Sequence, residues 1–396
     1  MKSSTRLLGV LGIVVVAMLC AAGCGEKPAE PVVPGVEPPT GPPYVIGAMF
    51  AITGDASSLG MPERDTAEMV EKMINEAGGI DGRPLEIVIE DTKGEPAETL
   101  KAAKRLVEGS DVLAIVGPSR TGTTMAVIEY MEKVEVPLVS CAAGVTIVEP
   151  VKKWVFKTPQ TDRMAIEKII EYLKEKKITR IASLSDNTGF GKGGRREIEE
   201  LMPAAGIRVV TLDEYGPKDT TMEIQLTKIK GTTAQAVVCW GTPPGPAIVA
   251  KNMRQLGLSI PLVCSHGVAN ETFLKIAGEA ANGVVLPAGR LIVVDQISPD
   301  DPQLSVLEDY AERYRAHTGK SPDTFGGHAW DAVQLVVKAL DEVDEDRAAI
   351  RDAVEKTTGF VGTGGVFNYS AEDHNGLTKD AFVMVEIVDG TWKLAK

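Results

Sequence analysis

The sequence predicts an α/β fold in two lobes, each a doubly wound, mostly parallel sheet flanked by helices. Short apolar runs alternate with amphipathic stretches of helical length from Tyr44 onward, and this alternation is typical of a parallel sheet with helices on both faces. The alternation restarts after about residue 160, and 396 residues are more than one hydrophobic core usually serves. We find no repeat of solenoid length. The chain is therefore expected to form two α/β domains.

Residues 1–23 are predicted to be a lipoprotein signal peptide. Lys2 and Arg6 supply positive charge ahead of an apolar run at 7–19, which is too short to span a bilayer comfortably. The small residues before Cys24 resemble a bacterial lipoprotein cleavage site, so we expect lipid on the sulfur of Cys24. The alternative is an ordinary secretory signal with an incidental cysteine.

Residues 24–43 are predicted to be a tether. They are rich in proline and poor in residues that form a core, a composition that gives a semi-extended chain. No later run has the length of a transmembrane helix. We therefore expect a globular body on the periplasmic or extracellular face of a bacterial membrane, held to the membrane only through a lipid anchor.

The first α/β run begins at Tyr44. A helix expected over 62–79 ends at a pair of glycines, which are the usual residues just past a helix C-terminus. Crossovers between parallel strands are right-handed, which leaves few topologies. The predicted strands are 44–51, 85–91, 112–117 and 136–141, and the other predicted helices are 96–109 and 125–133.

The second run repeats this pattern with helices over 164–177 and 191–206 and strands over 180–185 and 207–215. The alternation continues through 222–230, 234–240, 246–257 and 261–265, followed by two long helices, 303–319 and 328–343. The C-terminal segment predicts strands around a turn at Asp389 and Gly390.

Composition and motifs argue against several classes of function. The net charge of −13 argues against nucleic acid or an anionic lipid surface as a partner, and aromatic residues, at 5%, are too few for a base-stacking surface. No G-x-S-x-G, Walker-type or H-E-x-x-H motif is present. The glycine-rich segment 189–194 has the wrong spacing for a phosphate loop and is interpreted as a flexible turn. Asp186, Cys264 and His266 could be drawn as a catalytic triad, but nothing in their spacing indicates one. We therefore do not expect an enzyme.

Three cysteines remain in the globular part, each at the carboxyl end of a predicted strand: Cys141, Cys239 and Cys264. With His266 they are the candidates for a zinc site. Free cysteine is, however, among the most buried residue types, and no close C-x-x-C pair is present. We expect buried thiols, no metal and no cofactor.

The segment 113–124 is the strongest candidate for a ligand site. A buried apolar run ends at Gly117, and Ser119 and Thr121 then precede a helix. The first N–H groups of a helix lack intrahelical partners and favour an anion; the alternative is that one of these hydroxyls simply caps the helix. Segments at 141–144, 190, 240–242 and 265–266 also follow predicted strands, and two sheets facing each other would form a cleft lined by these turns.

The chain from Tyr44 to Lys396 resembles the periplasmic solute-binding proteins of branched-chain-amino-acid-type ABC importers, which have a type I, two-lobed fold. The motifs that carry the resemblance are ITGDASSLG at 52–60, INEAGGIDGRPLEIV at 74–88, IVGPSRTGTT at 115–124, VPLVSCAA at 136–143, RIASLSDNTGFG at 180–191, SHGVAN at 265–270, IAGEAANG at 276–283 and HAWDAVQLV at 328–336.

The resemblance implies how the chain divides and moves. It assigns one lobe to 44–161 plus 290–367 and the other to 162–289 plus 368–396, with crossovers near Thr161, Gly289 and Phe367. The two lobes would close like a hinge on a small ligand. We expect the protein to be a monomer and to bind the permease subunits of an ABC transporter.

The resemblance also assigns roles to residues in this cleft. The ligand carboxylate would lie at Ser119, Arg120 and Thr121. The usual ammonium site falls on Ala142, Ala143 and Gly144, where a carbonyl survives but a hydroxyl is missing. The matching wall positions are Leu59, Phe190, Thr242 and Phe325.

His266 stands where amino-acid binders have an acidic residue that pairs with the ammonium. With Arg120 it is expected to favour an anionic ligand, because a buried ammonium without a carboxylate loses a charge-assisted hydrogen bond. We therefore expect an extracytoplasmic solute-binding lipoprotein of an ABC importer that takes an amino-acid-like or carboxylate ligand. It should not bind leucine, isoleucine or valine tightly. The alternative is a sensor that signals through a separate partner chain.

Overall fold

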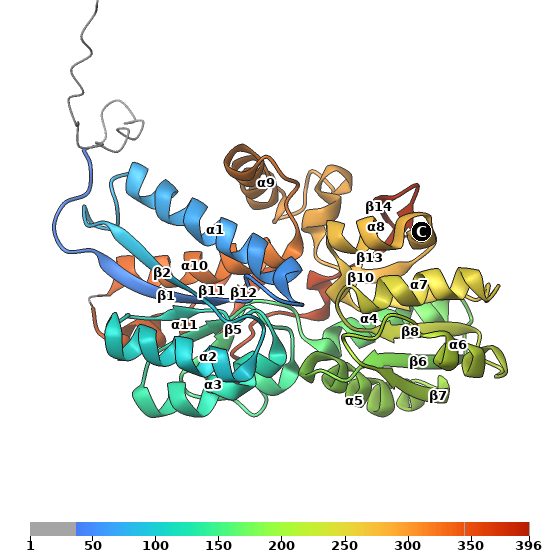
Figure 1. The fold of residues 1–396 in the computed structure, drawn as a ribbon. Coiled ribbons are helices and arrows are strands. Elements are labelled where there is room, and N and C mark those ends of the chain that lie inside the picture. The colour runs from blue at the N-terminus through green and yellow to red at the C-terminus, as the bar shows by residue number, and fades with distance from the viewer. Residues whose placement is uncertain (1–36, 344, 396) are drawn as a thin grey trace, which may run out of the picture.

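Two sheets organise the computed structural model, which describes residues 37–343 and 345–395. The sheets lie side by side, each covered by helices (Figure 1). We call the five-stranded sheet with its helices the first lobe and the seven-stranded sheet with its helices the second lobe. The predicted signal peptide, Cys24 and most of the predicted tether lie outside the described residues.

All strands of the five-stranded sheet are parallel, in the order β2-β1-β3-β4-β5. Its middle strand is apolar and fully buried, as expected of a strand covered on both faces. The strands are β1 Tyr44–Phe50, β2 Leu85–Asp91, β3 Ile115–Val116, β4 Leu138–Ser140 and β5 Val155–Lys157.

A separate hydrophobic core covers each face of this sheet. On one face α1 and α10 pack together, and Val70 and Val336 join Ile46 and Val116 in one cluster. On the other face α2 and α3 bury Ala103, Val127 and Ile128 against Ile115 and Leu138. The first-lobe helices are α1 Ser57–Glu76, α2 Pro96–Lys104, α3 Thr121–Val134, α9 Leu304–Thr318, α10 Thr324–Glu342 and α11 Arg347–Glu355, with a small antiparallel pair, β11 Thr358–Val361 and β12 Val366–Asn368.

The second sheet has the order β14-β13-β10-β9-β8-β6-β7, parallel from β10 to β7 and antiparallel at β13 and β14. Helices α4 and α5 bury one face, and α6, α7 and α8 bury the other. The strands are β6 Arg180–Asp186, β7 Arg208–Tyr215, β8 Ala236–Trp240, β9 Leu262–Cys264, β10 Val285–Ala288, β13 Val383–Val388 and β14 Thr391–Leu394; the helices are α4 Asp162–Glu175, α5 Gly189–Ala204, α6 Glu223–Lys230, α7 Gly245–Gln255 and α8 Glu271–Ala277.

The predicted fold class is confirmed: both sheets are mostly parallel and have helices on both faces. The chain leaves the first lobe after β5, returns to that lobe after β10 to form α9, α10, α11 and the β11-β12 pair, and enters the second sheet again at β13. The lobe boundaries given above stay a prediction. The predicted C-terminal turn is confirmed, because β13 and β14 form a hairpin around Asp389 and Gly390.

Two predicted helix starts are wrong. Helix α3 begins at Thr121, four residues before the predicted start at Met125, so the threonines of the GTT sequence belong to its first turn. Helix α5 begins at Gly189, so the glycine-rich segment 189–194 is helical and not a flexible turn. Thr188 caps this helix by accepting a hydrogen bond from the N–H of Gly191.

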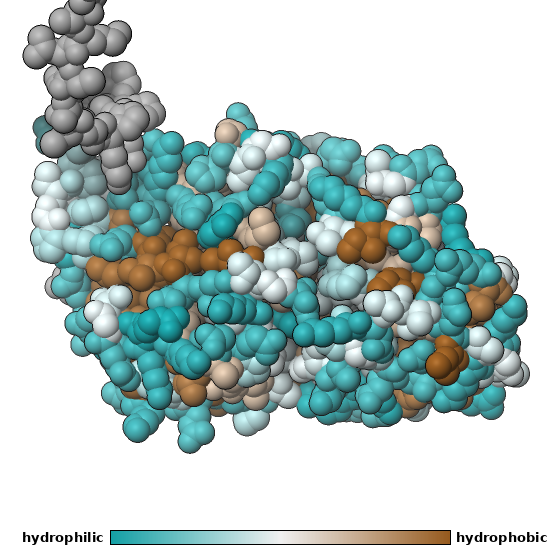
Figure 2. Space-filling model, in the orientation of Figure 1, coloured by the Kyte–Doolittle hydropathy of each residue, from teal (hydrophilic) through white to brown (hydrophobic). Residues whose placement is uncertain are grey.

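Most of the surface in Figure 2 is hydrophilic, with a band of apolar residues in the first lobe between α1 and α2. This is the region of β2, the edge strand of the first sheet, where Val88 and Ile89 are half-buried. Of the helices in the described part of the chain, none combines the length and the apolar character that crossing a membrane requires.

Candidate ligand-binding site

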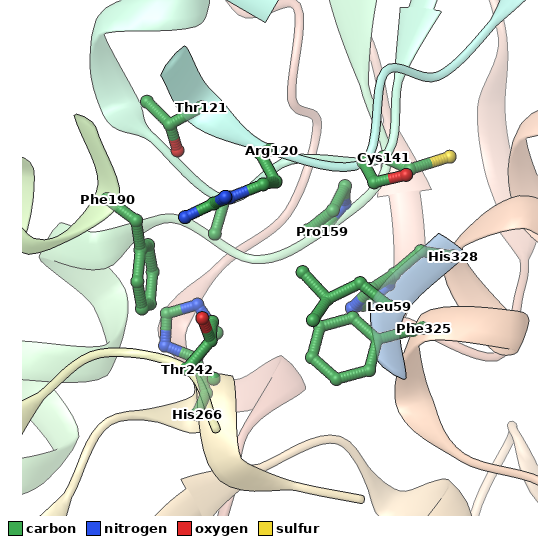
Figure 3. A pocket seen from close by; sticks show the side chains of 13 residues that line it. Leu59, Arg120, Thr121, Cys141, Pro159, Phe190, Thr242, His266, Phe325 and His328 are labelled. Atoms are coloured by element: carbon green, nitrogen blue, oxygen red, sulfur yellow. The ribbon is translucent and has the colours of Figure 1, made fainter. Parts of the chain in front are cut away.

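A small cavity lies between the two lobes, at the carboxyl ends of their parallel strands (Figure 3). Ligands of open α/β sheets bind at this end of the strands. The lining residues are Leu59, Ser119, Arg120, Thr121, Cys141, Ala143, Pro159, Phe325 and His328 from the first lobe and its exit, and Phe190, Thr242, His266 and Gly267 from the second.

The cavity brings together nearly all the residues that sequence analysis selected. Leu59, Ser119, Arg120, Thr121, Ala143, Phe190, Thr242, His266 and Phe325 line it, whereas Ala142 and Gly144 do not. Sequence analysis missed four lining residues as site candidates. Cys141 begins the segment 141–144 that was expected to line the cleft, Gly267 follows the segment 265–266, and His328 begins the HAWDAVQLV motif, but nothing in the sequence marks Pro159.

Ser119 has partners within the protein. Its hydroxyl donates to a carboxylate oxygen of Glu63 and accepts a hydrogen bond from the N–H of Ala51 at 2.9 Å. Glu63 is fully buried in α1, and this burial raises the pKa of its carboxyl well above the usual range, against the opposing effect of the Ser119 hydrogen bond. The Ser119 hydroxyl therefore ties α1 to the start of α3 and does not cap the helix.

Thr121 is the first residue of α3, and its hydroxyl also does not cap the helix. The Thr121 Oγ1 atom accepts a hydrogen bond from the N–H of Gly144 at 3.2 Å. A Cβ on Gly144 would lie 2.3 Å from the Thr121 Cγ2 atom, so only glycine permits this contact. Because neither hydroxyl serves as a cap, the N–H groups of the first turn of α3 are left to other acceptors.

Arg120 places a positive charge at the cavity. Its side chain extends over the cavity toward Phe190 (Figure 3). Within the described part of the chain, its guanidinium has no hydrogen bond or ion pair, and its one electrostatic partner is the buried carboxylate of Asp186. Asp186 is itself occupied, because its Oδ1 atom accepts from the Thr188 N–H at 2.9 Å.

His266 lies among aromatic rings. Its ring centroid is 5.4 Å from that of Phe190, 5.7 Å from that of Trp240 and 5.3 Å from that of Phe382. Both ring nitrogens are buried and have no hydrogen-bond partner in the described chain. Burial lowers the pKa of His266 to about 3, with smaller contributions from His328 and Lys157. His266 is therefore neutral at neutral pH and adds no positive charge to the cavity.

His328 is a second neutral imidazole at the cavity. It lies in α10, with its ring edge-on to Phe325 at a centroid distance of 6.3 Å. Its Nδ1 atom is buried and lacks a partner among the described residues. Burial lowers the pKa of His328 to about 3, and the charge of Lys157 acts in the same direction. The cavity therefore contains two uncharged imidazoles with free hydrogen-bonding capacity.

The structure gives no support to the two other kinds of site considered from the sequence, a catalytic triad and a zinc site. Cys264 is fully buried and, like Asp186, does not line the cavity, so the two do not form an open triad with His266. Cys141, Cys239 and Cys264 are free and buried. Among the described residues no group of three or more His, Cys, Asp or Glu side chains is arranged to hold a metal.

Replacing His266 by phenylalanine should make the unliganded protein less sensitive to acid. The pKa of His266 is about 3 in the folded state and 6.5 in its ordinary state, so below pH 6.5 the unfolded chain binds a proton that the folded chain does not. The free energy of unfolding therefore falls as pH falls from 6.5 toward 3, by about 2 kcal/mol between pH 7 and pH 5. Urea unfolding at both pH values should show a loss that is smaller by this amount in the variant than in the wild type, because the variant keeps the contribution of His328. The same pH dependence in both proteins would contradict the assignment.

Comparison with known proteins agrees with this architecture. The periplasmic binding protein family model matches residues 43–391. A Leucine-, isoleucine-, valine-, threonine-, and alanine-binding protein of Pseudomonas aeruginosa is 26% identical over 318 residues, which cover 80% of this chain and 83% of that protein.

Solved structures give the same relationship. An extracellular ligand-binding receptor from Rhodopseudomonas palustris has a TM-score of 0.85 at 25% identity, covering 90% of this chain and 100% of that one. The branched-chain amino acid transporter substrate binding protein LivJ from Streptococcus pneumoniae, solved with isoleucine, has a TM-score of 0.81 at 27% identity, covering 90% and 99%. These proteins are named for binding solutes and not for catalysing a reaction. The chain therefore belongs to the periplasmic binding protein family and has the type I fold.

Proposed function

We propose that this protein is the solute-binding lipoprotein of an ABC importer, that it binds a small amino-acid-like or carboxylate ligand between its lobes, and that it delivers this ligand to permease subunits. Membership in the family implies a periplasmic or extracellular location. The observation that carries the proposal is the inter-lobe cavity, which combines an unpaired Arg120, the start of α3 and apolar walls.

Each predicted site residue has a role in this proposal. The ligand carboxylate accepts hydrogen bonds from Arg120 and from the N–H groups that begin α3 at Thr121. Ser119 and Gly144 position this turn, because the Ser119 hydroxyl binds Glu63 of α1 and the Gly144 N–H binds Thr121. Ala142 supports the segment that carries Gly144, since its N–H donates to the Ser140 hydroxyl. The remaining contacts to the ligand come from Leu59, Ala143, Phe190, Thr242, His266 and Phe325.

The proposal is tested by screening solutes for an increase in melting temperature, since a ligand of the folded state alone stabilises it. Amino acids, hydroxy acids, oxo acids, aromatic acids and short carboxylates form the panel, with the matching amides as uncharged controls. We expect carboxylates to raise the melting temperature and amides to leave it unchanged. A protein that no small solute stabilises would contradict a transport-binding function.

A tight ligand should also draw the two lobes together, because it contacts both. Small-angle scattering should then give a smaller radius of gyration with the ligand, while circular dichroism stays the same. Identical scattering curves with and without a ligand of confirmed affinity would argue against hinge closure.

The lipid anchor is tested in a bacterial host that processes lipoproteins. Cys24→Ala should move the protein from the membrane fraction to the soluble extracytoplasmic fraction, because an acyl chain contributes about 0.8 kcal/mol for each CH₂ that it buries. Cys20→Ala is the matched control and should remain at the membrane. Membrane association of the Cys24→Ala protein equal to that of the wild type would contradict the anchor.

A further inference from the structure

We infer that the cavity selects a carboxylate whose second polar group is an uncharged hydroxyl or carbonyl, and that it discriminates against the α-amino acid with the same carbon skeleton. The inference rests on the proposed function, since it takes the inter-lobe cavity as the ligand site. It names the class of solute that the chemistry of this cavity fits.

The first step is the charge of the lining. Among the lining residues, Arg120 carries the only full charge at neutral pH, because both His266 and His328 are neutral and no aspartate or glutamate is present. A monoanion balances this charge. An α-amino acid would bring an ammonium group as well, and a buried ammonium without a carboxylate partner is strongly unfavourable.

The carboxyls that interact with lining residues do not supply that partner. Glu63 receives the Ser119 hydroxyl, and its unpaired Oε1 atom is buried in a residue that does not line the cavity. Asp186 is bound by Thr188, and Asp323 caps α10 by accepting hydrogen bonds from two N–H groups of its first turn. Burial raises the pKa of all three carboxyls, so each is also a weaker counter-charge than an exposed carboxylate.

The second step is the set of free imidazole nitrogens. The Nδ1 and Nε2 atoms of His266 and the Nδ1 atom of His328 are buried without partners. A neutral imidazole has one N–H donor and one acceptor nitrogen. It can therefore donate to a carbonyl or accept from a hydroxyl, and either bond would satisfy a nitrogen whose isolation is costly.

The third step is the shape of the remaining wall. Leu59 and Phe325 face the cavity from one side and Phe190 from the other (Figure 3). These side chains offer no polar atoms, so the rest of the solute must be apolar. A short hydroxy or oxo acid with a branched aliphatic or phenyl side chain has all three features.

Calorimetry at pH 7 with two matched sets of solutes tests the inference. One set is leucine, its α-hydroxy acid, its α-oxo acid and the acid with an unsubstituted α-carbon; the other is phenylalanine, phenyllactate, phenylpyruvate and phenylpropanoate. Within a set only the substituent of the α-carbon changes. In at least one set we expect the hydroxy or the oxo acid to bind at least about tenfold more tightly than the amino acid, and also more tightly than the unsubstituted acid.

Two substitutions separate the contributions. His266→Glu supplies a counter-charge and should shift the preference toward the amino acid by about tenfold or more. His266→Phe keeps the ring packing but removes the hydrogen bonds, so the hydroxy or oxo acid should lose its advantage over the unsubstituted acid. His317→Glu, at an exposed position of α9, makes the same charge change away from the cavity and should alter neither ratio.

The outcomes distinguish this inference from the proposed function. If in neither set the hydroxy or the oxo acid binds more tightly than both the amino acid and the unsubstituted acid, the inference is overturned and a solute-binding function stands. If no member of either set binds but another solute raises the melting temperature, the inference is again overturned alone. If no solute of any class binds, both fail.

Discussion

Arg120→Gln should weaken the binding of the tightest carboxylate by about ten- to a hundredfold. The guanidinium is the only charged group of the lining at neutral pH, and no described residue forms a hydrogen bond or ion pair with it. A charge-assisted hydrogen bond contributes about 1.5–3 kcal/mol, which corresponds to this range of affinity. Calorimetry of the wild type and the variant with the same carboxylate measures the loss.

Arg254→Gln is the matched control, because Arg254 is exposed on α7 and does not line the cavity. Its affinity should equal that of the wild type. The affinity of Arg120→Lys should lie between those of Arg120→Gln and the wild type. Lysine keeps the positive charge but cannot form the planar two-bond contact of arginine. Full affinity in Arg120→Gln would show that the ligand carboxylate lies elsewhere.

Trp240→Ala should give the largest loss of stability of any substitution considered, about 3–5 kcal/mol in the free energy of unfolding. Trp240 ends β8 and is fully buried. Its ring centroid lies 5.6 Å from that of Phe190 and 5.7 Å from that of His266, so it supports two residues of the cavity. Urea unfolding should show the loss, and calorimetry should show weaker ligand binding as well.

Trp392→Ala is the matched control for Trp240→Ala, because it removes the same side chain at a different place. Trp392 is half-buried in β14 and does not line the cavity. It should cost less stability than Trp240→Ala, because less apolar surface is buried there, and it should leave ligand affinity unchanged. Equal losses in the two variants would contradict a supporting role for Trp240.

The sequence predicted the fold well where strands are buried on both faces, because such strands are continuous apolar runs. It failed at helix starts that glycine and threonine occupy. The segment 189–194 resembles a loop because glycine lowers helix propensity, yet α5 needs a small residue there. A Cβ on Gly194 would lie 2.3 Å from the Trp240 ring. Close packing between two segments decides this case, and a single sequence does not record it.

The site was predictable to the extent that its residues follow strand ends. Ser119, Arg120, Thr121 and Thr242 are examples, and all line the cavity. His328 was not selected, because in the sequence it is one residue of an amphipathic helix. The neutral state of His266 was also not predictable, since it depends on burial among rings from three separate segments.

The most direct test of the central claim is a crystal structure with the carboxylate that stabilises the protein most. We predict that the ligand lies between the lobes, with its carboxylate against Arg120 and the first N–H groups of α3 and its apolar part against Phe190 and Phe325. A ligand on the surface of one lobe, with the cavity of Figure 3 still empty, would contradict the account.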